Sequence, residues 1–218
     1  MVYLIISNSY HILDEEVGKI FKSLDDVEII NYNDTSLEEI INLASYTSLF
    51  NYEKKMIIKN FDLSSNKNEL LEKYIENQNP LSQIIFLCNE KVDERKKVVK
   101  LLKERNTYTY IKPLTYKDIN QRLIDKCKKN GFKLQPNDAS FITFESLSNY
   151  DIAIEELNKV FLYYINPCEI KREDLNNIIS HNIDDNNFKF IDAVIQRDIK
   201  TSMNLIKNLK LFKVEPLG

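Results

Sequence analysis

Short apolar segments alternate with segments of helical periodicity through the first half of this chain, and that alternation constrains the fold more than any other feature. Val2–Ile6 is a continuous run of large residues, a pattern typical of a strand buried on both faces. Further strands are predicted at residues 27–32, 56–59, 84–88 and 107–111. Helices are expected between them, the first carrying an apolar stripe from Leu13 to Leu24. Strands joined by helical crossovers predict a parallel sheet covered by helices on both faces.

Pro113 ends this alternation, and only helical patterns follow it. Each of four helices is predicted from its apolar positions: Ile119, Leu123 and Cys127, a helix that Gly131 ends; Phe141, Ile142 and Phe144, after Pro136; Ile154, Leu157, Phe161 and Ile165; Leu175, Ile178 and Ile179. Two more helices are expected beyond a polar joint at residues 182–187. We therefore expect an α/β domain at 1–113, a small helical domain at 114–182, and the first helices of a third domain at 183–218. Two helices cannot bury their stripes alone, so further helical sequence is expected to complete that domain.

Composition excludes several classes of protein. Lys and Arg number 30 against 33 Asp and Glu, and a net charge of −3 gives no general attraction to nucleic acid. Cys88, Cys127 and Cys168 are too far apart for a disulfide framework or a zinc site. No signal peptide or membrane-spanning segment is recognised, because the first apolar run is too short for either. A cytoplasmic protein is expected.

The first turn lacks the residues that a phosphate loop needs. Such a loop requires glycine and lysine, whereas residues 7–11 read Ser-Asn-Ser-Tyr-His, and Gly18 falls within the first helix. No convincing magnesium-binding carboxylate follows the later strands. The two histidines, His11 and His181, fall in different domains. We therefore expect no nucleotide hydrolysis, no catalytic residue, no cofactor and no metal site, and we interpret the acidic runs 14–16 and 184–185 as helix N-terminal charge and solvated linker.

An apolar pair follows the second helix, which begins near Ser36 with Glu39 in place for a capping box. If the helical phase of about 100° per residue continues, Ser48 lies on the buried stripe while Leu49 and Phe50 lie off it. A strand begins close behind, at Lys54. The pair is then presented at a helix-to-strand corner, as expected of a protein-docking element. The alternative is that both residues cover the helix end.

Basic residues cluster on the helix near residue 100: Arg95, Lys96, Lys97, Lys100, Lys103 and Arg105. The ordinary interpretation is a solvated helix face. The alternative is a stripe that follows a DNA phosphate backbone, with Arg95, Lys96, Lys97 and Lys100 as possible contacts.

Over its whole length the chain resembles the delta-subunit family of bacterial DNA polymerase III clamp loaders. Four stretches carry the resemblance: residues 8–13 after the first strand, Ser48 to Phe50 before a basic-flanked strand, residues 154–159 with Tyr163 and Tyr164, and residues 187–194 with the later Glu215-Pro216. Glu155 departs from the usual Asn of the third stretch. Polar Tyr46-Thr47 stands where relatives often carry apolar residues.

The resemblance implies an AAA+/RecA-like domain without a phosphate loop, a lid-like helical domain, and the start of a collar domain. It implies a subunit that does not hydrolyse ATP and is not itself an enzyme, although it belongs to the DNA polymerase III holoenzyme. Leu49 and Phe50 would bind the sliding clamp (beta), with Ser48 and Tyr52 at the rim, and help open the ring. The other implied partners are the tau/gamma ATPase subunits and delta-prime, held through the collar, and primed DNA, with no membrane contact.

A different class stays open at this point. A degenerate AAA+ NTPase, or an adaptor acting on nucleic acid, would share the alternating pattern. Detectable nucleotide binding would favour the first of these, whereas failure to bind a sliding clamp would favour the second.

Overall fold

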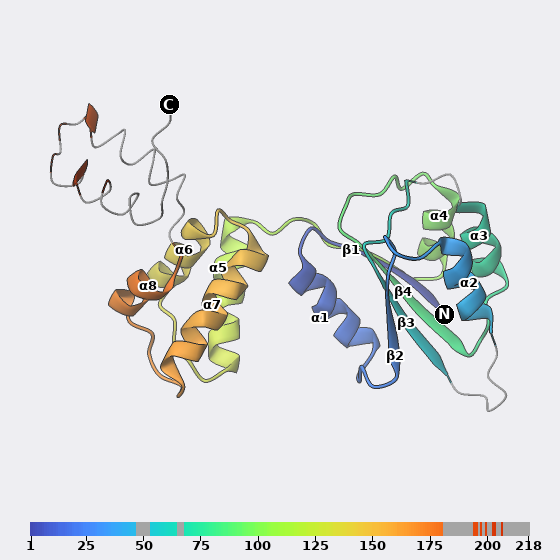
Figure 1. Ribbon diagram of the computed structural model, residues 1–218, viewed down its shortest axis with the longest axis horizontal. Helices are drawn as coiled ribbons and strands as arrows, with labels where there is room; N and C mark the ends of the chain where they lie inside the picture. The colour runs from blue at the N-terminus through green and yellow to red at the C-terminus, as the bar shows by residue number, and fades with distance from the viewer. Residues whose placement is uncertain are drawn as a thin grey trace. The chain divides into compact units, whose positions relative to one another are not determined.

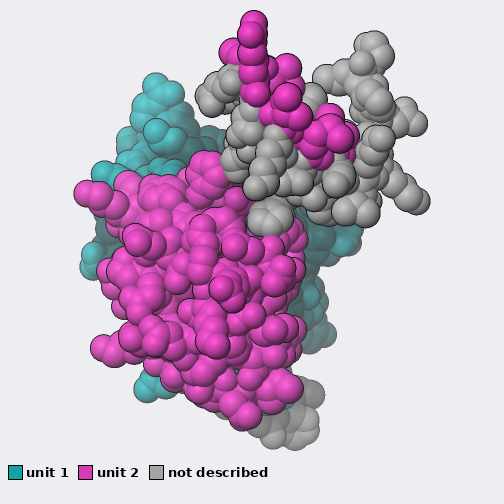
Figure 2. Space-filling view, turned by 90° about the vertical axis from the view of Figure 1, so that its left-hand side faces the viewer, with its two compact units in different colours: residues 1–113 teal, residues 114–218 magenta. Residues whose placement is uncertain are grey.

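The computed structural model describes residues 1–46, 53–64 and 68–180, together with the single positions 194, 195, 197, 199, 202, 203 and 206. The chain divides into two compact units, residues 1–113 and 114–218, which Figure 2 distinguishes by colour. The third domain expected at 183–218 lies outside the described residues except at those single positions.

The first unit is built on a parallel sheet of five strands in the order β2-β3-β4-β1-β5. The strands are β1 (Val2–Ile6), β2 (Val27–Asn31), β3 (Lys54–Lys59), β4 (Ser82–Cys88) and β5 (Tyr108–Tyr110). Leu4 of β1 pairs with Phe86 on one side and Tyr108 on the other, and every pairing is parallel. The parallel sheet predicted from the apolar runs is confirmed.

Helices cover both faces of this sheet, as predicted (Figure 1). Helix α1 (Tyr10–Ile20) packs on one face, against residues that include Ile5, Ile57 and Ile85. On the other face, α2 (Leu37–Ser45), α3 (Asn68–Glu76) and α4 (Lys97–Glu104) enclose the alternate residues of the same strands, such as Leu4 and Phe86. Because both sets are buried, the inner strands β1 and β4 are apolar over most of their length, whereas the edge strand β2 has exposed and polar positions.

Two expectations about α1 are wrong. The stripe predicted to reach Leu24 stops earlier, because the helix ends at Ile20 and Phe21 adopts an extended backbone; Leu24 is 57% exposed. The acidic run 14–16 does not supply charge to the first turn, which contains no acidic residue. Ser9 caps the helix there instead.

The second unit contains α5 (Tyr116–Lys129), α6 (Pro136–Glu145), α7 (Tyr150–Tyr164) and α8 (Arg172–Ile178). Gly131 ends α5, as predicted. It adopts φ +79°, its N–H donates to the Lys128 carbonyl at 3.1 Å, and the Phe132 N–H donates to the Cys127 carbonyl at 2.9 Å. This double hydrogen bond is the Schellman motif, which requires the left-handed backbone that glycine adopts without strain.

Two residues assigned to helical stripes face outwards. Phe144 is 48% exposed because Ala139, Ile142 and Thr143 form the buried face of α6. The Thr143 hydroxyl satisfies its buried position by donating to Asn120 at 2.5 Å. Ile165 is 84% exposed, because α7 ends at Tyr164 and Ile165 takes a positive φ of 54°. Those two stripe predictions are wrong.

Candidate functional site

The turn between β1 and α1 is closed by its own side chains. Ser9 caps α1, its hydroxyl oxygen accepting from the Ile12 N–H at 3.2 Å, and the Ser7 hydroxyl oxygen accepts from the Ser9 N–H at 3.2 Å. Both serines are buried. In phosphate-binding proteins the free N–H groups of such a helix start receive the phosphate. Here side-chain oxygens already occupy two of those donors.

Little space remains beside this turn. A cavity of about 50 Å³ lies between the start of α1 and the ends of β3 and β4, lined by residues that include Tyr10, Leu13, Asn60 and Asn89. That volume is far below the 300–1,000 Å³ or so typical of small-molecule sites.

Amide side chains span the carboxyl edge of the sheet. The Asn60 side chain donates to the Asn31 side chain at 3.1 Å, and the Asn89 side chain donates to Asn60 at 3.3 Å. Beside them, Asp62 and Glu90 line a separate hollow of about 310 Å³. Hydrogen bonds from Ser64 lower the pKa of Asp62, so this carboxylate is stabilised by a local turn.

The expected docking element, Ser48, Leu49, Phe50 and Tyr52, lies outside the described residues. Its two flanks are described. Helix α2 has the predicted capping box between Ser36 and Glu39 and ends at Ser45, where Tyr46 becomes extended. The condition that the helical phase continues is therefore not met at Tyr46, and the orientation of Ser48, Leu49 and Phe50 stays a prediction.

The upstream flank is firmly fixed to the unit. Ala44 is fully buried, and its carbonyl accepts from the Tyr74 hydroxyl and the Asn79 side-chain amide, each at 3.4 Å. On the downstream side, Met56 of β3 is also fully buried. Residues 47–52 are therefore attached at both ends to well-packed elements, the arrangement by which rigid scaffolds present functional loops.

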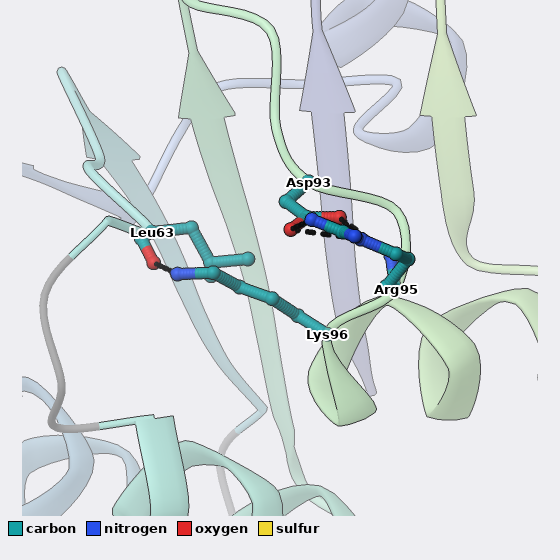
Figure 3. Close-up of polar contacts among 4 residues, drawn as sticks. All are labelled: Leu63, Asp93, Arg95 and Lys96. Carbon is teal, nitrogen blue, oxygen red and sulfur yellow. Dashed lines mark hydrogen bonds and ion pairs between the residues drawn. The ribbon is translucent and has the colours of Figure 1, made fainter.

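Two of the four possible DNA contacts, Arg95 and Lys96, precede α4 rather than lying on it, and they are turned towards partners within the chain (Figure 3). Arg95 donates to both carboxylate oxygens of Asp93, at 2.8 and 2.9 Å, and these bonds lower the pKa of Asp93 to about 2. The Lys96 ammonium group donates to the Leu63 carbonyl.

The other two differ from each other. Lys97 lies between Glu72 and Glu76 of α3, at 3.4 and 3.3 Å. Lys100 is exposed on α4 and forms no ion pair with the residues that the structure describes. The structure thus places the four cations near one another but leaves them unequally available.

The stretch 154–159 forms a buried polar contact that the sequence analysis missed. Glu156 of α7 accepts from the Lys159 ammonium at 2.7 Å and from the Ser180 N–H at 3.0 Å. Lys159 also donates to the Ser180 hydroxyl at 2.8 Å. The available signal was a carboxylate between buried Ala153 and Leu157 on the inward face of α7.

Among the residues that the structure describes, no group of three or more His, Cys, Asp or Glu side chains is placed to hold a metal ion. Cys88 and Cys127 are buried free thiols, and Cys168 is an exposed one. Within the same residues, no helix combines the length and apolarity that crossing a membrane requires.

Comparison with known proteins gives consistent results. The family model described as "DNA polymerase III, delta subunit" matches residues 2–112. The Bacillus subtilis (strain 168) protein "DNA polymerase III subunit delta" is 22% identical over 233 residues, which cover 99% of this chain and 67% of that protein.

Solved structures support the fold. The Bacillus subtilis DNA clamp loader delta protein aligns with a TM-score of 0.70 and 20% identity, covering 99% of this chain and 68% of its own. The Thermotoga maritima RuvB Holliday junction branch migration motor aligns with a TM-score of 0.51 and 12% identity, covering 81% of this chain and 60% of its own. The architecture is therefore an AAA+ fold, a parallel α/β sheet followed by helices. Since the family model covers just over half of the sequence, the chain belongs to the DNA polymerase III delta subunit family.

Proposed function

We propose that this chain is a clamp-loader subunit that binds the sliding clamp through Leu49 and Phe50 and helps to open the ring without hydrolysing ATP. Membership of the delta family is the observation that carries the proposal. The fixed flanks of residues 47–52 support it, because an apolar pair held between buried Ala44 and Met56 has a firm base from which to enter a pocket.

Ring opening by such a subunit is a shift of population. A protein favours the open ring only as far as it binds the open ring more tightly than the closed one. The binding energy of an apolar plug therefore limits the work that the subunit can do. Fully burying a Leu or a Phe side chain contributes roughly 1.5–3 kcal/mol.

The test is the double variant Leu49→Ala/Phe50→Ala, measured for clamp binding by titration calorimetry. The double substitution should weaken the binding free energy by about 3–6 kcal/mol, a decrease in affinity of a hundredfold or more. The melting temperature should stay close to that of the unmodified protein. The matched control is Leu24→Ala/Ile29→Ala, which removes two exposed apolar side chains from the same unit and should leave clamp affinity unchanged.

Two outcomes would contradict the proposal. One is a large fall in melting temperature with intact clamp affinity, because core residues truncated to Ala lose about 2–5 kcal/mol of stability each. The other is failure of the unmodified chain to bind the clamp at all.

A role without nucleotide is part of the same proposal. Ser7 and Ser9 occupy donors at the start of α1, and the neighbouring cavity holds about 50 Å³. Calorimetric titration with ATP or ADP should therefore give no binding at physiological concentrations. A micromolar dissociation constant would favour the degenerate NTPase instead.

The further partners follow from the family. We propose that the tau/gamma ATPase subunits and delta-prime hold this subunit in the loader, through the collar domain expected from residue 183 onwards. Primed DNA would be met inside that assembly. Of the four candidate backbone contacts, Lys100 is the one most available to a phosphate, because Arg95, Lys96 and Lys97 have partners within the chain.

A further inference from the structure

Three apolar side chains are exposed at the end of α7, in the second unit. Leu162 is 80% exposed, Tyr163 57% and Ile165 84%, whereas the helix before them buries Leu157 and Val160. A single exposed apolar residue is ordinary on a protein surface, but three within four positions form a patch of the kind that marks an interaction site. We call Leu162, Tyr163 and Ile165 the apolar tip.

The backbone turns Ile165 outwards in a strained conformation. The Asn166 N–H donates to the Tyr164 carbonyl across Ile165, whose φ of 54° and ψ of −51° are those of the rare γ-turn with positive φ. A β-branched residue seldom adopts a positive φ, because its Cβ crowds the backbone. Strained positions of this kind cluster at functional sites. The turn therefore favours a role for Ile165 beyond covering the end of its own helix.

The end of α5 lies beside the segment that follows the apolar tip. A Cβ at Gly131, which ends α5, would lie 3.1 Å from the Pro167 Cβ. The Phe132 ring stacks on the Phe161 ring of α7, with 4.7 Å between the ring centroids. The C-terminal ends of the two helices therefore lie at the same end of the helical unit (Figure 1).

The end of α5 carries an excess of positive charge. Residues 126–133 include the lysines 126, 128, 129 and 133 and no acidic residue. Lys133 pairs with Glu169 at 3.0 Å, whereas Lys128 and Lys129 are exposed and form no ion pair with the residues that the structure describes. Lysines in a last turn complement the helix dipole, but that role does not account for the apolar tip beside them.

We propose that the apolar tip, together with Lys128 and Lys129, docks an acidic amphipathic segment of another protein. Apolar side chains of that segment would cover the tip, and its carboxylates would face the two lysines, because complementary charge selects the partner. Leu162 and Ile165 favour a protein over single-stranded nucleic acid, whose bases stack on aromatic rings. The lysines are also fewer than the roughly four to eight basic residues typical of a lipid-binding cluster.

The probe is a fluorescently labelled synthetic peptide that carries leucine on one helical face and glutamate on the other. It is titrated into the full chain and followed by fluorescence anisotropy. The unmodified chain should bind this peptide, and its affinity should fall as salt is added. The matched peptide with lysine in place of glutamate should not bind.

Variants at the two parts of the surface should have different effects. Leu162→Ala/Ile165→Gly should bind the acidic peptide about tenfold more weakly or worse, as expected when apolar anchors are removed. Lys128→Gln/Lys129→Gln should reduce the dependence of affinity on salt. The matched control is Leu49→Ala/Phe50→Ala, which should bind the peptide like the unmodified chain and so separates this surface from the pair proposed to bind the clamp.

Ile165→Gly separates docking from a structural role. Glycine adopts a positive φ without strain, and the lost side chain is exposed, so the urea midpoint should stay the same or rise while peptide binding weakens. A lower midpoint with unchanged peptide binding would show that Ile165 serves its own unit, and would overturn the proposal.

Other occupants would also overturn the proposal. Equal binding of the acidic and basic peptides would remove the electrostatic argument. Binding of oligo(dT) or of phosphatidylglycerol vesicles in place of the acidic peptide would assign the tip to nucleic acid or lipid. Self-association of the chain that Leu162→Ala/Ile165→Gly abolishes would assign it to a second copy. None of these results bears on clamp binding, which is tested with different residues.

Discussion

Removing the Glu156 carboxylate should weaken the attachment of Ser180 to α7 and leave the rest of the described helices in place. The side chain is only 7% exposed, and its two oxygens accept from Lys159 and from the Ser180 N–H. Ser180 lies 24 residues further along the chain, directly before the part of the chain that the structure does not describe. In Glu156→Ala, the Ser180 N–H loses its acceptor and Lys159 keeps only the Ser180 hydroxyl.

The expected size follows from these contacts. A hydrogen bond to a charged group contributes about 1.5–3 kcal/mol. Because the Lys159 side chain is 45% exposed, water replaces most of the hydrogen bond that Lys159 loses, and the Ser180 N–H accounts for most of the effect. Truncation also removes a buried methylene, at about 0.8 kcal/mol. We therefore expect Glu156→Ala to lower the free energy of unfolding by about 2–3 kcal/mol. Glu156→Gln keeps the shape but turns one acceptor into a donor, so it should lose about 1 kcal/mol.

Urea unfolding followed by far-UV circular dichroism measures the stability, and hydrogen exchange at the Ser180 amide measures the contact itself. Glu173→Ala is the matched control, since it removes an exposed carboxylate from the neighbouring α8 and should cost less than about 1 kcal/mol. Exchange at Ser180 should be faster in Glu156→Ala than in Glu173→Ala. Equal exchange in the two variants would refute the assigned role of Glu156.

Three further changes have defined outcomes. Gly131→Ala should lower the free energy of unfolding by more than about 1 kcal/mol and shift the urea midpoint downwards, because φ is +79° and the new Cβ would lie 3.1 Å from the Pro167 Cβ. An unchanged midpoint would contradict the Schellman assignment. Because the pKa of Glu39 in the folded protein is lowered from its ordinary value of 4.5, the ionised carboxylate stabilises the fold above pH 4.5. This contribution is lost as the pH falls through the pKa of the folded state. The free energy of unfolding should therefore vary less between pH 7 and pH 3 in Glu39→Gln than in the unmodified protein. If DNA follows α4 in the assembled loader, Lys100→Ala should reduce the salt slope of DNA binding by about 1 and Arg95→Ala by much less, whereas equal effects would argue against unequal availability.

The sheet was predictable because its signal is local. Five-residue apolar runs such as Val2–Ile6 have few alternatives to a buried parallel strand, and Ser36 with Glu39 marks a helix start within four residues. Helix ends were harder to place. Apolar residues continue in phase to Leu24, but the backbone leaves the helix after Ile20, and periodicity does not register that change.

The polar contacts were not predictable because their partners are distant in sequence. Lys96 reaches the Leu63 carbonyl of another segment, and Glu156 reaches Ser180, while composition assigns such charges to solvent. Arg95 and Asp93 are close in sequence and form an ion pair, but the clustering of basic residues by itself gave no indication that Arg95 has this partner. The identity of Leu49 and Phe50 as a docking pair rests on resemblance, and it stays a prediction.

The serine-closed turn at the start of α1 has a consequence for timing. Ser7 and Ser9 occupy two donors at this helix start, so if ATP does not bind there, as we propose, the turn keeps one geometry whether ATP is abundant or exhausted. In an assembly driven by ATP hydrolysis, such a subunit would not change its conformation with each cycle of hydrolysis. Its affinity for a ring would be constant. The times of binding and release would then be set by neighbouring subunits that expose or cover its binding surface.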